Sequence, residues 1–268
     1  MSTKLDIENK TFQKDFSDVL NVFSRSENFS FCRFSDGEVF MMQGKEILLA
    51  DNGAIVGDQK LPGRYAEEDR KHYNPKEHEF YRQKLEDSLT FRADNYYKGL
   101  SCRCCCVGQE GFDWQLNKIG PGDEHNLTWA NLMINSNYLD YINKFVPLFK
   151  TKRIFSVINN LANISNWGLD FQPEKNFPIG SNCIINDYGV IEEIKNFIRL
   201  NNIKDSVFLL SASSLSNMIA HQCYMEYPNN TYIDIGSSLN PFMPGINSRR
   251  SYMNQLSTGV IDKRVCIW

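Results

Sequence analysis

The sequence predicts an α/β fold, a Rossmann-like and mostly parallel sheet with helices on both faces. Strand-like apolar runs alternate with helix-like periodicity through the second half of the chain, which is the signature of a parallel sheet covered by helices. One of these runs, Val207–Leu210, is apolar without interruption, as expected for a strand buried on both faces. Two others end in polar side chains, at Asn159-Asn160 and at Asn186-Asp187.

The chain is long enough for one such domain with a proper core, because it has 268 residues of which 42% are hydrophobic. We treat residues 1–268 as a single domain, with an N-terminal helical segment (1–28), a core (29–242) and a C-terminal tail (243–268). The formal net charge of -3 and the lack of a basic block argue against a nucleic-acid partner. The polar N-terminus and the lack of a long apolar run lead us to expect a cytoplasmic protein without a transmembrane segment, of unspecified oligomeric state.

The first half of the chain contains fewer regular patterns. Apolar residues at helical spacing predict helices, and short apolar runs predict strands: a helix over 12–24, a strand over 29–35, a helix from about 75 to 89, and a strand over 98–107. The stretch 51–70 is rich in Gly, Asp and charge, which predicts a long loop. After a turn at 120–123, we expect a helical pattern that runs through Trp129, Leu132 and Met133 and then Tyr138, Tyr141, Ile142 and Phe145.

The second half is more regular. We expect strands over 153–158, 181–185, 207–210 and 232–235, and helices over 190–198 and 215–223. In an open parallel sheet, ligands bind in a crevice at the carboxyl ends of the strands, so the residues that follow these strands are the first place to look for a site.

Several of the eight cysteines lie close together, in the run Cys102-Arg103-Cys104-Cys105-Cys106. Zinc ligands are usually separated by two to four residues, and this run lacks that spacing. We interpret it as a buried strand that uses cysteine as a small apolar residue, with Cys102, Cys104 and Cys106 on one face.

A cluster of small hydroxyl residues, Ser211-Ala212-Ser213-Ser214, lies between a predicted strand and a predicted helix. Free backbone N–H groups and the helix dipole make such a turn suitable for phosphate binding by Ser211, Ser213 and Ser214. A plain serine N-cap is the structural alternative. No G-x-G-x-x-G or Walker A pattern occurs, which disfavours a nicotinamide enzyme or a P-loop ATPase.

The segment Arg33-Phe34-Ser35-Asp36-Gly37-Glu38 places an arginine and two carboxylates directly after a predicted strand. Asp36 and Glu38, with Gly37 allowing a sharp turn between them, can hold a hard cation such as Mg²⁺ or Mn²⁺ together with substrate phosphates. Arg33 can contact a phosphate or hold a carboxylate. An arginine–carboxylate pair that merely closes the strand end is the alternative.

This segment resembles the R-[FY]-[GS]-D-G-E motif of the GT-D glycosyltransferases, the family once called DUF1792. Three later segments are similar to family segments in the same order, so that the resemblance extends from residue 29 to about 242. They are Ala130-Asn131-Leu132 leading to Asn135 and Asn137-Tyr138, the turn Leu210–Ser214, and Tyr232-Ile233-Asp234-Ile235-Gly236-Ser237. The turn lacks the Gly-Pro of the family, and Ser237 stands where the family often has histidine.

The resemblance implies a metal-dependent transfer of a sugar from a nucleotide diphosphate donor, a UDP-sugar above all, to a hydroxyl of a glycan or glycoconjugate acceptor. Asp36 and Glu38 would then hold Mn²⁺ or Mg²⁺, and Arg33 would assist in catalysis. The donor and its phosphates would contact five further residues: Asn131, Ser211, Ser213, Ser214 and Asp234.

Three points stay open at this stage. The general base is unassigned, because Glu38, Asp187 and Asp234 all lie at predicted strand ends. A metal-dependent phosphohydrolase or phosphotransferase would use the same carboxylates and turn. A non-catalytic nucleotide- or sugar-binding module on the same fold is the third class, since a fold does not fix a function.

Overall fold

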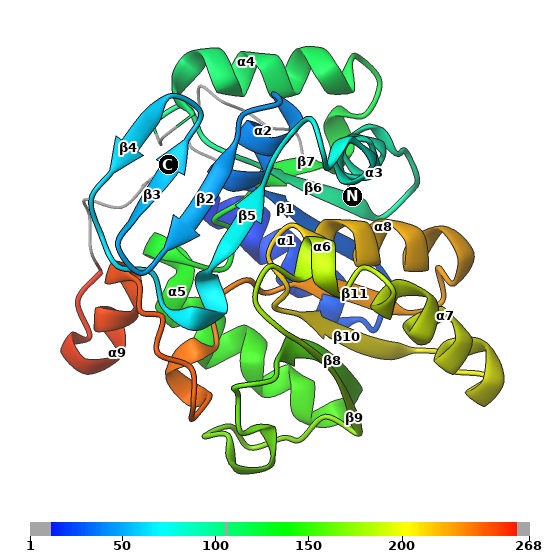
Figure 1. Ribbon diagram of the computed structural model, residues 1–268. Helices are drawn as coiled ribbons and strands as arrows, with labels where there is room; N and C mark the ends of the chain where they lie inside the picture. Colours follow the sequence, from blue (N-terminus) through cyan, green and yellow to red (C-terminus); the bar gives the residue numbers. More distant parts are fainter. Residues whose placement is uncertain (1–11, 105–106, 262–268) are drawn as a thin grey trace.

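The computed structural model describes residues 12–104 and 107–261 and has two sheets (Figure 1). The main sheet has seven parallel strands in the order β7-β6-β1-β11-β10-β8-β9. The predicted α/β class with a mostly parallel sheet is therefore confirmed. The strands are β1 (Ser30–Phe34), β6 (Tyr96–Leu100), β7 (Leu127–Trp129), β8 (Arg153–Asn159), β9 (Lys175–Ile179), β10 (Ser206–Leu210) and β11 (Thr231–Asp234).

Helices cover both faces of this sheet (Figure 1). They are α1 (Phe12–Ser24), α2 (Asp36–Met42), α3 (Glu79–Thr90), α4 (Gly108–Ile119), α5 (Tyr138–Asp140), α6 (Cys183–Asn186), α7 (Val190–Asn201), α8 (Leu215–Glu226) and α9 (Gln255–Thr258). Successive side chains of a strand point to opposite faces, so a central strand contributes to two separate cores. In β10, for example, Phe208 and Leu210 belong to one core and Val207 and Leu209 to the other.

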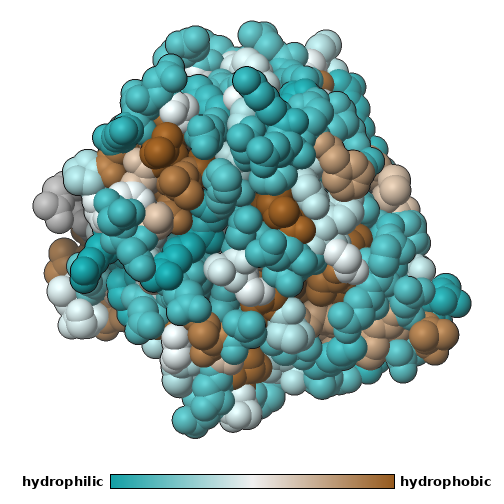
Figure 2. All heavy atoms as spheres, in the orientation of Figure 1, coloured by the Kyte–Doolittle hydropathy of each residue, from teal (hydrophilic) through white to brown (hydrophobic). Residues whose placement is uncertain are grey.

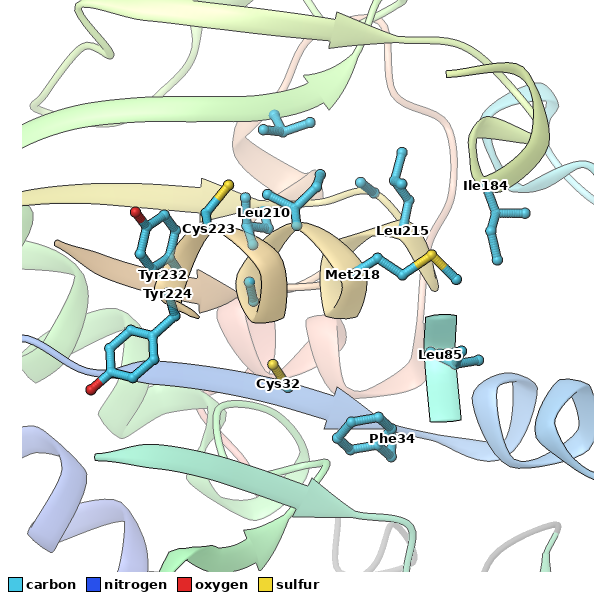
Figure 3. Close-up of a cluster of buried hydrophobic side chains, with 14 of the residues drawn as sticks. Cys32, Phe34, Leu85, Ile184, Leu210, Leu215, Met218, Cys223, Tyr224 and Tyr232 are labelled. Atoms are coloured by element: carbon cyan, nitrogen blue, oxygen red, sulfur yellow. The ribbon is translucent and has the colours of Figure 1, made fainter. Parts of the chain in front are cut away.

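The first core lies beneath α8, which packs on β1 and β11 (Figure 3). Met218 and Cys223 of α8 lie against the strand side chains Cys32, Leu210 and Tyr232, all fully buried. The second core, on the opposite face, is rich in aromatic rings: Phe23 of α1 stacks on Phe145 with ring centroids 4.7 Å apart.

A second, antiparallel sheet of four strands, β4-β3-β2-β5, stands beside the carboxyl edge of the main sheet (Figure 1). It contains β2 (Ile47–Ala50), β3 (Gly53–Val56), β4 (Gln59–Leu61) and β5 (Lys71–Tyr73). The predicted loop over 51–70 is therefore wrong. Its strands are very short, none of the three residues of β4 is buried, and the turn residues that join the strands dominate the local composition. Figure 2 shows apolar side chains gathered over this small sheet, where Leu61 is 43% exposed.

Three further predicted elements are corrected. The apolar residues of 181–185 form the short helix α6, and the edge strand β9 lies upstream, where Pro178 is tolerated because an edge strand need not donate every N–H. Trp129 ends the strand β7 instead of starting a helix. The later part of the same predicted pattern is helical, because Tyr138 lies in α5 and Tyr141–Phe145 form a helical turn after it.

The cysteine strand predicted over 98–107 is also wrong, because β6 ends at Leu100 and the chain then turns. Cys102 is buried but Cys104 is exposed, so the two do not share a buried strand face. Cys105 and Cys106 lie outside the described residues, as do residues 1–11 of the N-terminal segment and 262–268 of the tail. The predicted helices over 12–24, 190–198 and 215–223, and the strands over 153–158, 207–210 and 232–235, are confirmed within one to three residues.

Candidate functional site

The topology creates a crevice above the carboxyl end of β11. Its neighbours β1 and β10 are followed by α2 and α8, which pack in the core of one face. After β11 the chain turns to the other face, where Leu239, Met243 and Ile246 are buried. Open α/β sheets bind ligands at such a topological switch point, where the connections of neighbouring strands go to opposite faces of the sheet.

A cavity of about 900 Å³ occupies this position. Its floor is formed by the residues after β1, β10 and β11, and its walls by the small sheet and the segment 240–252. Seven of the eight residues predicted as catalytic or donor-binding line it: Arg33, Asp36, Glu38, Asn131, Ser211, Ser213 and Ser214. The fold thus brings together side chains that are far apart in the sequence.

Arg33 leaves the carboxyl end of β1 and lies across the crevice. Its Nε donates a hydrogen bond of 2.6 Å to the carbonyl oxygen of Ala130. The guanidinium lies directly over Gly236, since a Cβ built on that glycine would be 1.7 Å from Arg33 Nη1. No carboxylate within the described chain is close enough to Arg33 for an ion pair, so the alternative of a pair with Asp36 or Glu38 is wrong.

Asp36 and Glu38 lie in the first turn of α2, not on a sharp turn at Gly37 as predicted. Residues two apart on a helix point in different directions. Asp36 is accordingly exposed, and its carboxylate accepts the N–H of Gly37 at 2.9 Å. Glu38 is buried: Oε2 accepts the N–H of Ser35 at 3.0 Å and Oε1 accepts the hydroxyl of Ser214 at 2.6 Å.

The turn after β10 is tied into the site by its hydroxyl groups. Ser211 donates to the carbonyl oxygen of Gly236 at 2.8 Å, and Ser214 donates to Glu38. Ser214 occupies the N-cap of α8, but its hydroxyl makes no capping bond, so the simple N-cap alternative does not describe it. Ser213 adopts a left-handed backbone conformation (φ 49°), and its hydroxyl accepts a hydrogen bond of 2.6 Å from Lys71 Nζ.

Asn131 follows β7 at one end of the cavity. The residue is 6% exposed, and its Nδ2 has no hydrogen-bond partner in the described structure. A buried amide donor without a partner costs free energy, which a polar ligand in the cavity would relieve.

Asp234 ends β11 but is not among the side chains that line the cavity. Burial, opposed by the nearby Arg33 and reinforced by Glu38, raises the pKa of its carboxyl group to about 7. Its Oδ1 accepts the N–H of Gly236 at 3.0 Å. Asp187 also lies outside the lining and accepts the N–H of Gly180. Of the three base candidates, only Glu38 reaches the cavity.

The small sheet contributes to the cavity in a way that no sequence pattern predicted. Lys71 of this sheet lines the cavity, as do Glu68, Asp69 and Arg70 just before it. Their run of charges looked like a solvated loop. The tail was also missed: Tyr252 lines the cavity and its hydroxyl lies 2.8 Å from that of Ser237.

Asp36 and Glu38 fit a divalent cation that is also bound by the ligand's phosphates. Among residues 12–104 and 107–261, no three His, Cys, Asp or Glu side chains are grouped to hold a metal by themselves. Both oxygens of Glu38 already accept hydrogen bonds, whereas Asp36 is exposed at the cavity. Mg²⁺ usually binds one or two carboxylates together with substrate phosphates, and this donor set fits that mode.

No helix in the described part of the chain is long and apolar enough to cross a membrane.

No family model matches the sequence, and no curated protein matches it. Two solved structures share its fold. One is a selenomethionine-substituted structure of domain of unknown function 1792, 13% identical over 92% of this chain and 82% of that chain, with a TM-score of 0.55. The other, 14% identical with the same coverage and TM-score, is described as showing that this highly conserved domain has a distinct glycosyltransferase fold. The resemblance inferred from the motif at Arg33–Glu38 is thereby confirmed at the level of the fold.

Proposed function

We propose that the protein is a metal-dependent glycosyltransferase that transfers a sugar from a nucleotide diphosphate donor, a UDP-sugar, to a hydroxyl of a glycan or glycoconjugate. The observation that carries the proposal is the cavity at the β11 crevice, in which Arg33, Asp36 and the serine turn meet on a fold described as that of a glycosyltransferase. A cavity of about 900 Å³ is large enough for a nucleotide sugar.

The donor diphosphate would lie against the Arg33 guanidinium, which itself covers Gly236. Arg33 is held by Ala130, which leaves its terminal nitrogens to donate to phosphate oxygens without further ordering. The turn Ser211–Ser214 lies on the other side of the crevice, at the N-terminus of the twelve-residue helix α8. Asn131 would donate its unpaired amide N–H to a hydroxyl or phosphate oxygen.

Asp36, with Glu38 beside it, would hold Mn²⁺ or Mg²⁺, which when bound supplies a Lewis acid for the charge that develops on the leaving nucleotide diphosphate. Glu38 also fixes the geometry of the protein, because it connects the start of α2 to the start of α8 through Ser214. Removal of Glu38 therefore disturbs two loops, whereas removal of the Asp36 charge leaves the surrounding structure intact.

The experiment is a thermal-shift panel of nucleotides and nucleotide sugars with and without Mn²⁺, on the wild type and on Asp36→Asn. A ligand at one hundred times its dissociation constant stabilises a protein by about 2.7 kcal/mol, which raises Tm by several degrees. The proposal expects a UDP-sugar to stabilise the wild type only with metal, and Asp36→Asn to lose the metal dependence. A panel in which no nucleotide stabilises the wild type would overturn it. Release of UDP in the presence of acceptor glycans then tests transfer itself.

A further inference from the structure

Among residues 12–104 and 107–261, four cationic side chains line the cavity, Arg33, Arg70, Lys71 and Arg250, and they divide into two kinds. Arg70 is paired with Asp51, and Arg250 with Asp69 at 2.9 Å. For Arg33 and Lys71, no carboxylate of the described residues lies within ion-pair distance. Unpaired cations that line a cavity lower the free energy of an anion bound there.

These two cations flank the same crevice. Arg33 comes from β1 and covers Gly236, whereas Lys71 comes from the small sheet and contacts Ser213, after β10. The strands β1 and β10 are the two neighbours of β11, so the crevice above β11 has one unpaired cation on each side. The hydroxyl of Ser211, bound to the carbonyl oxygen of Gly236, joins the two sides across the floor.

The backbone around Lys71 is fixed by Asn182, the residue just before α6. The carbonyl oxygen of Arg70 accepts the N–H of Asn182 at 2.9 Å, and the N–H of His72 donates to Asn182 Oδ1 at 3.1 Å. On its other edge, β5 pairs with β2, with Lys71 opposite Leu49. Lys71 is thus held in position before any ligand arrives, and only one of the three N–H donors of its ammonium group is used by Ser213.

We propose that Lys71 is the second cationic contact for the diphosphate of the ligand, opposite Arg33. The small sheet then has a function: it carries this lysine to the crevice and encloses the anion between two cations. The proposal rests on the proposed function for the identity of the ligand as a nucleoside diphosphate. The position of the anion follows from Arg33 and Lys71 alone.

The test is calorimetric titration of UDP, UMP, uridine and inorganic pyrophosphate, in the presence of Mn²⁺, into the wild type, Lys71→Met, Lys71→Arg and Lys60→Met. Methionine retains the unbranched shape of the lysine stem and removes the charge. Lys60 is the matched control, since it lies on β4 of the same small sheet, is exposed and does not line the cavity.

Hydrogen bonds to charged groups are worth about 1.5–3 kcal/mol, so Lys71→Met should weaken UDP binding by roughly 10- to 100-fold. The loss should be smaller for UMP and absent for uridine, and UDP binding should become less sensitive to salt. Lys71→Arg should recover part of the affinity, and Lys60→Met should match the wild type. A structural role for Lys71 would instead lower Tm and weaken UDP and uridine alike.

The outcomes separate this inference from the proposed function. If UDP binds the wild type and Lys71→Met equally, Lys71 is no anion contact, and the proposed function stands without it. If pyrophosphate binds in a Lys71-dependent manner while no nucleotide binds, Lys71 is an anion contact and the nucleotide-sugar proposal falls. If the wild type binds none of the four probes, both are overturned.

Discussion

The closest approach in the site, between Arg33 and Gly236, yields a prediction that needs no ligand. We consider Gly236→Ala. The backbone at Gly236 has φ 49°, a left-handed conformation that costs an L-residue about 1–2 kcal/mol. The added Cβ would also lie 1.7 Å from Arg33 Nη1, much closer than any non-bonded contact, so the guanidinium must move.

The movement of the guanidinium has its own cost. Arg33 Nε would lose its bond to the carbonyl oxygen of Ala130, a charged hydrogen bond worth about 1.5–3 kcal/mol. Gly44→Ala is the control, because Gly44 is also left-handed (φ 73°) but has no atom within 4 Å of the position that the added methyl group would take. This variant should therefore lose only the free energy that the left-handed backbone conformation costs. We therefore expect Gly236→Ala to lower the free energy of unfolding by about 1.5–3 kcal/mol more than Gly44→Ala does.

Urea denaturation at 25 °C measures both costs, and a double-mutant cycle assigns the excess to Arg33. In an Arg33→Ala background there is no guanidinium to displace, so the cost of Gly236→Ala should fall to that of Gly44→Ala. If Gly236→Ala costs the same in both backgrounds, Arg33 does not lie over Gly236, and the assigned geometry of the crevice is wrong.

Three further predictions concern buried and exposed charges. Glu38→Gln should lower the free energy of unfolding by about 1–3 kcal/mol in urea denaturation, because an NH₂ group replaces one of the two oxygens that accept hydrogen bonds. Asp36 is exposed, so Asp36→Asn should change the free energy of unfolding by less than about 0.5 kcal/mol. Equal costs for the two variants would contradict the assigned geometry. Burial raises the pKa of Asp15 from 3.8 to about 7, so its contribution to stability is complete below pH 3.8 and is lost as the pH rises to about 7, by at most about 4 kcal/mol. Asp15→Asn should therefore flatten the fall in stability between pH 4 and 7, measured as the urea midpoint against pH, and an unchanged slope would refute this. Lys98→Met should cost about 3–5 kcal/mol in urea denaturation, since it leaves Asp123 buried without its partner at 2.5 Å, and a cost below 1 kcal/mol would show that the pair is not buried.

The sequence located the parts of the site on the main sheet because the topology of a parallel sheet constrains them. Residues directly after β1 and β10 must lie at one edge, so Arg33 and the serine turn could be placed there from the sequence alone. Local geometry was less predictable. The glycine in Asp36-Gly37-Glu38 suggested a turn, but the capping interaction of Glu38 with Ser35 starts a helix there instead.

The small sheet could not be predicted by the same reasoning. Its strands have three or four residues, too few for alternation of apolar and polar side chains to be visible. Lys71 lies in a run of charges that is typical of a solvated loop, and only the pairing of β5 with β2 brings it to Ser213. Asp234 was placed correctly at the end of a strand. Whether its carboxyl group faces the cavity or is buried beside it depends on packing, which the sequence pattern does not reveal.

The proposed function requires a diphosphate and a divalent cation to bind together in the β11 crevice. Crystals grown with UDP and Mn²⁺, with diffraction recorded at a wavelength where manganese scatters anomalously, test it most directly. We predict an anomalous peak at the carboxylate of Asp36, with diphosphate density between Arg33 and Lys71. Density for the nucleotide elsewhere on the molecule, or manganese bound away from Asp36, would contradict the account.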